Sequence, residues 1–356
     1  MAKTLKRTLA IVIVFTFLLT GCQKKSTDLK NPVKEKENTK MIVSLLVDSF
    51  GLEDGSINSQ AYQGLKDLKV DTGIDIEYEV AESDDKFLDT IDKLVEDGSK
   101  LIWGAGYQTS DAIKEASYKY KEINFASLDN PFDESSMPKN LTGTIFKTEE
   151  SSYLLGYITG YMTKTNKVAY LGGDKGVLTE KNEYGFRAGV LDASKERKMN
   201  ISLSVQYIGN FSDENKGRIM ATSIFDSDVD IIYADAGGAN LGAIQAAKEQ
   251  DKFLVVNEEG LIKLAPKNIL ISSKKNYSEV LNSLSYRFIG KDQIGGRNYE
   301  LGLRDNALGL SDFDEESGLV TKAVYDKAIN KKKEIAKASK TIPFNEASFK
   351  KYTSMK

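Results

Sequence analysis

Residues 41–47 read MIVSLLV, an apolar run that ends at Asp48 and is followed by a helical-period segment from about Asn58. Similar runs recur along the chain, separated by segments of about ten to fifteen residues with helical period. We expect strands at 41–47, 74–80, 100–103, 123–128 and 141–146, and a second set at 168–172, 201–208, 229–233, 253–256 and 269–272. This alternation predicts an α/β protein with doubly wound, Rossmann-like parallel sheets.

Helical periodicity is clear between the expected strands. Phe87, Ile91 and Leu94 recur on one face of a segment whose other face carries Asp and Lys. Further helices are expected at 149–163, 278–288 and 319–338.

The two sets of strands indicate two lobes joined by chain segments that pass from one to the other. Parallel sheets bind ligands outside the carboxyl ends of their strands, so two facing lobes would form one ligand cleft. The expected N-terminal lobe comprises residues 41–147 plus about 274–296, the C-terminal lobe comprises 148–273 plus about 297–325, and 326–356 form a C-terminal helix and tail.

The composition excludes several kinds of chemistry. The 356 residues include no His and one Cys, so no Ser-His-Asp triad, HExxH zinc site or Cys cluster can form. The 49 Lys and Arg against 52 Asp and Glu argue against a nucleic-acid partner. Neither G-x-S-x-G nor a phosphate-binding P-loop is present. We therefore expect a binding protein without enzymatic activity, cofactor or metal, and consider a hydrolase on this fold the weaker alternative.

The N-terminus has the features of a lipoprotein leader. A basic start is followed by the 11-residue apolar run Leu9–Leu19, which is too short for a membrane span of about 20 residues. The sequence Leu19-Thr-Gly-Cys22 then resembles a bacterial lipobox, which predicts a signal peptide over 1–21 and lipid on Cys22. The alternative is a free Cys after an ordinary signal peptide. Residues 22–40 are polar and predict a flexible tether, with the protein anchored on the cell membrane and facing outside the cytoplasm.

Polar residues follow the expected strands of the first lobe. Asp48 ends the first strand, Tyr107 follows two glycines after the third, and Asp129 ends the fourth. Asn58 is suited to cap the following helix. These side chains would reach a ligand in the cleft, although Asn58 could serve only as a cap and the acidic groups could be solvated.

The second lobe repeats this pattern. Phe211 lies in Gly-Asn-Phe-Ser-Asp after one strand, where its ring could stack on a flat ligand or belong to the core. The later strand ends carry Gly237, Gly238, Asn257, Glu259 and Lys275.

Several segments resemble one known family in the same order along the chain. The stretch 47–58 (VDSFGLEDGSIN) is similar to V-T-D-S-G-D-I-D-D-K-S-F-N, the opening motif of the basic membrane protein family of bacterial lipoproteins. Other matching segments are 101–107 (LIWGAGY), 184–189 (YGFRAG) and 207–213 (YIGNFSD). The resemblance extends from Met41 to about Leu310.

The resemblance implies a function and assigns roles to residues. The family includes purine nucleoside receptors, which are substrate-binding proteins of ABC transporters with the type I periplasmic-binding fold. It implies that a nucleoside is the ligand and an ABC permease the partner. The matching positions are Asp48, Asn58 and Asp129 around the base, Phe211 stacked on it, and Gly237, Gly238, Asn257 and Lys275 around the ribose; Tyr107 and Glu259 lie in the same loops.

Two positions depart from the family pattern. Ile57 stands where the family has a second stacking aromatic, and Asn257 where it has Asp in G-V-D-x-D-Q. Both changes weaken nucleoside contacts, because a ring and an ionised acceptor are lost. They keep open a modified nucleoside or a base as ligand, or a surface lipoprotein used for adhesion or signalling.

Overall fold

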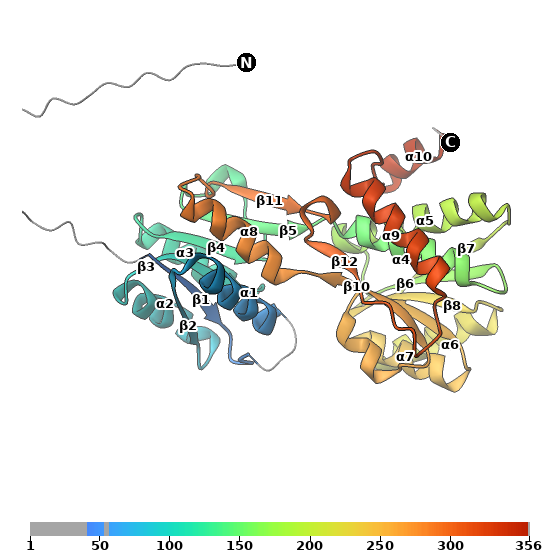
Figure 1. The fold of residues 1–356 in the computed structure, drawn as a ribbon. Coiled ribbons are helices and arrows are strands. Elements are labelled where there is room, and N and C mark those ends of the chain that lie inside the picture. Colours follow the sequence, from blue (N-terminus) through green and yellow to red (C-terminus); the bar gives the residue numbers. More distant parts are fainter. Residues whose placement is uncertain (1–40, 53–56, 355–356) are drawn as a thin grey trace, which may run out of the picture. The chain divides into compact units, whose positions relative to one another are not determined.

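The computed structural model describes residues 41–52 and 57–354, and their strands form two six-stranded sheets (Figure 1). The expected signal peptide, Cys22 and the tether lie outside the described residues. In the first sheet the order is β11-β5-β4-β3-β1-β2, and all neighbouring strands are parallel. Its strands are β1 (Ile42–Val47), β2 (Asp75–Val80), β3 (Ser99–Ala105), β4 (Asn124–Leu128), β5 (Leu141–Phe146) and β11 (Arg297–Leu301).

The second sheet has the order β12-β10-β9-β8-β6-β7 and is parallel except for β12, which pairs antiparallel with β10. Its strands are β6 (Lys167–Gly172), β7 (Ser202–Tyr207), β8 (Ile231–Asp235), β9 (Phe253–Val256), β10 (Ile269–Lys275) and β12 (Leu308–Leu310). The predicted α/β architecture with two parallel sheets is therefore confirmed.

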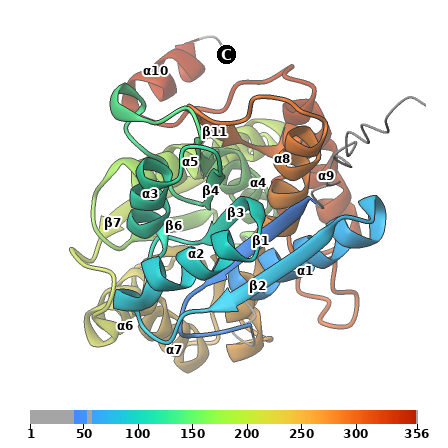
Figure 2. The ribbon, with the colours of Figure 1, turned by 90° about the vertical axis from the view of Figure 1, so that its left-hand side faces the viewer.

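Helices cover both faces of the first sheet because its strands bury side chains on both sides. Leu45 and Trp103 belong to the apolar cluster that includes Leu65 of α1 (Ile57–Thr72) and Leu281 of α8 (Tyr277–Ile289). Leu46 and other alternating side chains point to the opposite face, which α2 (Phe87–Glu96) and α3 (Ser110–Lys119) cover (Figure 2). The short 3₁₀ segments in this part are η1 (Asp84–Lys86) and η2 (Glu134–Ser136).

The second sheet is covered in the same way. One face packs against α4 (Thr148–Met162) and α5 (Val177–Arg197), and the other against α6 (Glu214–Asp226) and α7 (Asn240–Glu249). The remaining elements are η3 (Gly237–Ala239), η4 (Glu259–Leu264), η5 (Leu303–Asp305), α9 (Lys322–Ala336) and α10 (Glu346–Ser354). No helix within residues 41–52 and 57–354 combines the length and apolar content needed to cross a bilayer.

Glycines bring the backbones of α4 and α5 into direct contact. A Cβ atom on Gly189 would lie 2.1 Å from the carbonyl oxygen of Tyr153, and one on Gly156 would lie 2.2 Å from that of Phe186. Both distances are far below van der Waals contact, so any larger residue would force the two helices apart.

The described chain passes between the two sheets at residue 147, at residue 276 and over residues 302–307. After the second crossing, α8 is held to the first sheet by the indole of Trp103, which donates to Ser285 Oγ at 2.9 Å. After α8, β11 pairs with β5 and completes the first sheet. The sequence-based assignment of residues from about 297 to the second lobe was therefore wrong for β11, and the chain returns to the second sheet only after Leu301.

Candidate functional site

Asp48 and Asn58 form a buried hydrogen-bonded pair at the carboxyl end of β1. Asn58 Nδ2 donates to Asp48 Oδ1 at 2.7 Å, and the backbone N–H of Phe50 donates to the same oxygen at 3.0 Å. The expectation that Asn58 caps its helix was wrong, because α1 already begins at Ile57. Asn58 is 1% exposed, and its Oδ1 is buried without a hydrogen-bond partner among the described residues. Such an acceptor gains free energy from any donor that reaches it.

Ile57 and Tyr107 lie at the neighbouring loop that follows β3. The side chain of Ile57 is partly buried, and its Cδ1 lies 3.6 Å from the place where a Cβ of Gly106 would be. Gly106 has φ of +79°, which turns the chain out of β3. Tyr107 is 76% exposed. The acidic residues Glu53 and Asp54 lie outside the described residues.

Asp129 links the two sheets at the carboxyl ends of their strands. It follows β4 with φ of +59°, and its N–H donates to Thr144 Oγ1 at 3.0 Å. Its carboxylate accepts from Lys275 Nζ at 2.5 Å and from the hydroxyl of Tyr277 at 3.0 Å. Lys275 ends β10 of the second sheet, so this ion pair brings the carboxyl ends of strands from both sheets together. Burial and the nearby carboxylate raise the pKa of Tyr277, which keeps the phenol protonated as a donor.

Phe211 presents an aromatic ring after β7. A Cβ on Gly173 would lie 2.3 Å from Phe211 Cδ1, so the absence of a side chain at residue 173 gives the ring its place. Gly237 has φ of +56° and packs against the carbonyl oxygen of Phe211, to which Ala239 N–H donates at 3.2 Å. The Phe211 residue is 49% exposed. It is therefore not a core side chain, and part of it is available for stacking on a flat ligand.

Asp235 and Asn257 are paired at the ends of the adjacent strands β8 and β9. Asn257 Nδ2 donates to Asp235 Oδ1 at 2.7 Å, while Tyr170 and Asn182 donate to Asp235 Oδ2 at 2.6 and 2.9 Å. Asp235 is 4% exposed, and this burial raises the pKa of its carboxyl group. Asn257 Oδ1 is buried and has no hydrogen-bond partner within the part of the chain that the structure describes.

Glu259 makes a charge contact with strand β10. It begins η4, and its carboxylate lies 3.7 Å from Lys274 Nζ, with both side chains partly exposed. Gly238 belongs to η3 beside Phe211, where a Cβ would lie 3.4 Å from the Phe211 carbonyl oxygen.

The order of strands explains how these residues come together. In the first sheet, β4, β3 and β1 are consecutive, so Asp129, Tyr107 and Asp48 follow neighbouring strands. In the second sheet β10, β9 and β8 are consecutive, so Lys275 at the end of β10 lies beside Asn257 after β9, and Asn257 beside the glycine turn after β8. The carboxyl ends of parallel strands lie on the same side of a sheet. Each set of residues therefore lies together at the carboxyl ends of its sheet.

Sequence reasoning missed two residues of this region. Asp235 is not among the predicted residues, although an acidic residue closing the apolar strand Ile231–Asp235 is itself a signal. Tyr277 could not be placed near Asp129 from sequence, because their contact depends on the chain crossing between the sheets at residue 276.

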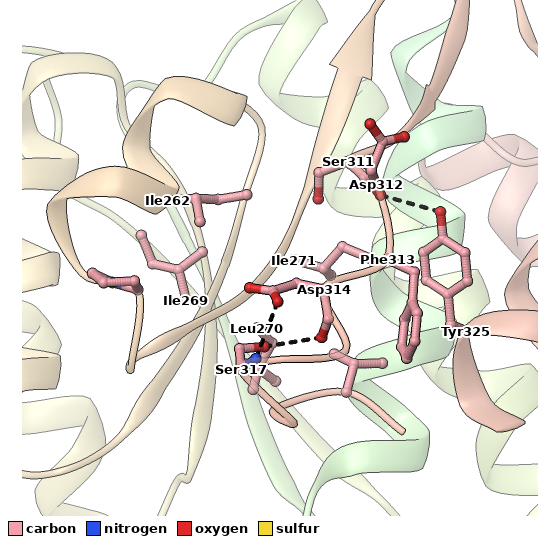
Figure 3. Close-up of a pocket in the computed structure, with 12 residues that line it drawn as sticks. Ile262, Ile269, Leu270, Ile271, Ser311, Asp312, Phe313, Asp314, Ser317 and Tyr325 are labelled. Atoms are coloured by element: carbon pink, nitrogen blue, oxygen red, sulfur yellow. Dashed lines mark hydrogen bonds between the residues drawn. The ribbon is translucent and has the colours of Figure 1, made fainter. Parts of the chain in front are cut away.

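Two cavities lie away from the predicted residues. The first, of about 30 Å³, lies between β10, η4 and the segment 311–320 and has room for roughly one water molecule (Figure 3). Tyr325 donates to the Ser311 carbonyl oxygen beside it at 3.2 Å. The second, of about 160 Å³, is lined by Val280, Ser283, Leu284, Arg287, Tyr299, Leu301 and Asp305.

Comparison with known proteins supports the resemblance found in the sequence. Residues 40–346 match the family model described as ABC transporter substrate-binding protein PnrA-like. The chain is 31% identical over 340 residues to basic membrane protein D of Borreliella burgdorferi (strain JD1), covering 95% of each chain. It is 34% identical over 313 residues to basic membrane protein B of Borreliella afzelii (strain PKo), covering 85% of this chain and 89% of the relative.

Solved structures of solute-binding proteins share the fold. An ABC transporter solute-binding protein of Conexibacter woesei matches with a TM-score of 0.69 and 20% identity over 86% of this chain and all of that chain. One from Aeropyrum pernix matches with a TM-score of 0.62 and 18% identity over 88% of this chain and 96% of that chain. The expected type I periplasmic-binding fold is confirmed.

Proposed function

Because the chain belongs to the family of PnrA-like ABC transporter substrate-binding proteins, we propose that it is a lipid-anchored receptor that captures purine nucleosides for an ABC permease. The family is one of binding proteins and not of enzymes. Nucleoside specificity, the lipid anchor and the permease are the parts that we propose here.

The observation that most supports a nucleoside ligand is the chemistry of the side chains at the carboxyl ends of the strands, which offer an aromatic ring and hydrogen-bond acceptors. A half-exposed aromatic ring at Phe211 suits a flat base, and the buried acceptor Asn58 Oδ1 suits a ring N–H. Asn257 Oδ1 on the second sheet suits a hydroxyl donor of the sugar. The ligand would contact both sheets, so that ligand binding stabilises one arrangement of the lobes, which a permease can recognise.

Thermal unfolding of the purified full-length protein tests the ligand. Inosine, guanosine and adenosine should raise the unfolding temperature increasingly with concentration, whereas uridine, cytidine and free ribose should have smaller effects. Phe211→Ala should remove most of this response, because the stacking surface is lost. Phe344→Ala is a matched control, since Phe344 is 43% exposed and lies outside the predicted site. A wild-type protein that responds to no nucleoside would contradict the proposal.

The anchor is tested separately. We propose that Cys22 carries the lipid, as the lipobox-like sequence before it indicates. Cells fed a palmitate analogue that can be labelled should incorporate it into the wild type and not into Cys22→Ser. Equal labelling of both forms would contradict lipidation at this residue.

A second candidate function is supported by the two departures from the family pattern. Ile57 offers no second ring, and Asn257 offers no ionised acceptor. A surface lipoprotein for adhesion or signalling could retain the fold with such a changed site. Absence of a response to nucleosides, together with normal lipidation, would favour this candidate.

A further inference from the structure

Asp235 and Asn257 are held as a unit by the pairing of their strands. Ala234 of β8 is in register with Val256 of β9, so the next residue on each strand emerges at the same level of the sheet. Their side chains meet at 2.7 Å. Asp235 also accepts hydrogen bonds from Tyr170 and Asn182, so Asn257 is connected through it to a buried network.

The chemistry of this network fixes the orientation of the Asn257 amide. Three donors point at the two oxygens of Asp235, from Tyr170, Asn182 and Asn257, which is the arrangement that an ionised carboxylate requires. A carboxylate has no hydrogen to donate, so Asn257 must turn its NH₂ group toward Asp235. The amide oxygen then points away from Asp235, and it is this buried atom that has no partner in residues 41–52 and 57–354.

We infer that Asp235 is a positioning residue that keeps Asn257 Oδ1 turned away from its own carboxylate as an acceptor, and thereby selects ligands with a hydroxyl or N–H donor at that point. This inference rests on the proposed function and deepens it. A nucleoside with its ribose hydroxyls satisfies the acceptor. An analogue without those hydroxyls leaves it buried and unpaired, which costs free energy.

Other charged and titratable groups around Asp235 are compatible with this role. Lys275 of β10 favours the ionised carboxylate, whereas Glu258 beside Asn257 opposes it. The hydroxyl of Tyr170 from β6 donates directly to the carboxylate, and burial keeps this phenol protonated by raising its pKa. Burial and the charge of Asp235 raise the pKa of Tyr233 in β8, so this phenol also stays protonated.

Exchange of the two residues provides the test in the full-length protein, with inosine and 2′,3′-dideoxyinosine as probes in calorimetric titrations. Wild type should bind inosine at least about tenfold more tightly than the dideoxy analogue. Asp235→Asn should lose much of this discrimination, since the Asn257 amide can then turn either end outward. The matched control is Asp230→Asn. Asp230 directly precedes β8, and its buried carboxylate accepts hydrogen bonds from Thr163 Oγ1 and from the backbone N–H of Lys164.

Asn257→Asp places two carboxyl groups in contact, so they must share a proton. We expect the inosine affinity of this variant to fall as the pH rises from 6 to 8, while wild type changes little. The double variant D235N/N257D restores one amide and one carboxylate, and should regain pH-independent binding and discrimination. The inference is overturned if Asp235→Asn discriminates like wild type, or if the double variant is no better than Asn257→Asp.

Failure of the proposed function gives a different result. In that case wild type binds neither probe. The interaction between residues 235 and 257 is then measured from the pH dependence of protein unfolding alone. Asn257→Asp should then lose stability between pH 6 and 8 relative to wild type, and the double variant should not. Equal pH dependence in the single and double variants would contradict a coupled pair whether or not a nucleoside binds.

Discussion

Lys275 Nζ lies 2.5 Å from Asp129 Oδ2, and the two residues belong to different sheets, since Lys275 ends β10 and Asp129 follows β4. Both side chains are partly buried, at 30% and 25% exposure, so the pair is less screened by solvent than a surface ion pair. The same two residues are predicted to contact opposite ends of a nucleoside. A ligand would therefore bind where the two lobes already contact each other.

Lys275→Met should weaken inosine binding at least about tenfold, because a charge-assisted hydrogen bond contributes about 1.5–3 kcal/mol. Titration calorimetry measures the change. Lys274→Met is the matched control, since the neighbouring Lys274 points to Glu259 at 3.7 Å, and its affinity should stay close to that of wild type. Equal losses in the two variants would show that general positive charge matters and not the contact of Lys275.

Ile57→Phe should strengthen purine binding by about twofold to tenfold, because an aromatic pair adds about 0.5–1.5 kcal/mol beyond the area it buries. The gain should be larger for guanosine than for a pyrimidine nucleoside. Ile57→Leu changes the shape of the side chain without adding a ring and should show no such gain. A matching gain in Ile57→Leu would rule out stacking as the cause.

Glu149 predicts a pH dependence of stability. This first-turn residue of α4 is 7% exposed, and its burial raises the carboxyl pKa from 4.5 to about 7. The folded protein therefore binds this proton more tightly than the unfolded chain. The contribution of Glu149 is neutral below pH 4.5, becomes increasingly destabilising as the pH rises from there to 7, and levels off above 7.

Removing this charge should therefore stabilise the protein at high pH. Urea unfolding of Glu149→Gln should show a gain of about 3 kcal/mol at pH 8, shrinking as the pH approaches 5. The exposed Glu315→Gln serves as the control. A gain in Glu149→Gln that does not vary with pH would contradict a buried, titrating carboxyl group.

Gly189→Ala should destabilise the protein by at least about 2 kcal/mol, because the new methyl group would overlap the Tyr153 carbonyl oxygen on α4. Gly260→Ala is the control, since a Cβ there meets no atom of the described residues within 4 Å. Thermal unfolding of the two variants should separate them clearly. Similar unfolding temperatures would mean that α4 and α5 can move apart freely.

Most of the fold could be predicted from apolar runs. The strands 141–146 and 253–256 have the predicted bounds, because each is a short uncharged run of apolar and β-branched residues at a mostly buried strand position. By contrast, β11 (RNYEL) carries charged residues and lies at a sheet edge, and β12 has three residues, so neither gives a strong pattern. Both depend on partners that are distant in sequence.

Long-range partners also limited the prediction of single residues. In the sequence, the cluster Lys331–Lys333 is typical of a solvated helix face, but Lys331 is a partial exception. Its ammonium group lies 3.0 Å from Glu196, and its side chain is 18% exposed over the ring of Tyr157. Helical period shows which residues share a face, but not which other helix packs against it. For the site, the strand ends could be read from sequence, whereas the contacts of Tyr277 could not.

The pairing of β11 with β5 also sets an order of events during synthesis. The first sheet begins with Ile42 but is complete only after Leu301 has left the ribosome. By then the residues of most strands of the second sheet have already been synthesised. Until then α1 lacks α8, whose Ser278 backbone packs directly on Gly64, and the edge of β5 is unpaired. The nascent N-terminal half is therefore exposed to aggregation for longer than its length alone suggests.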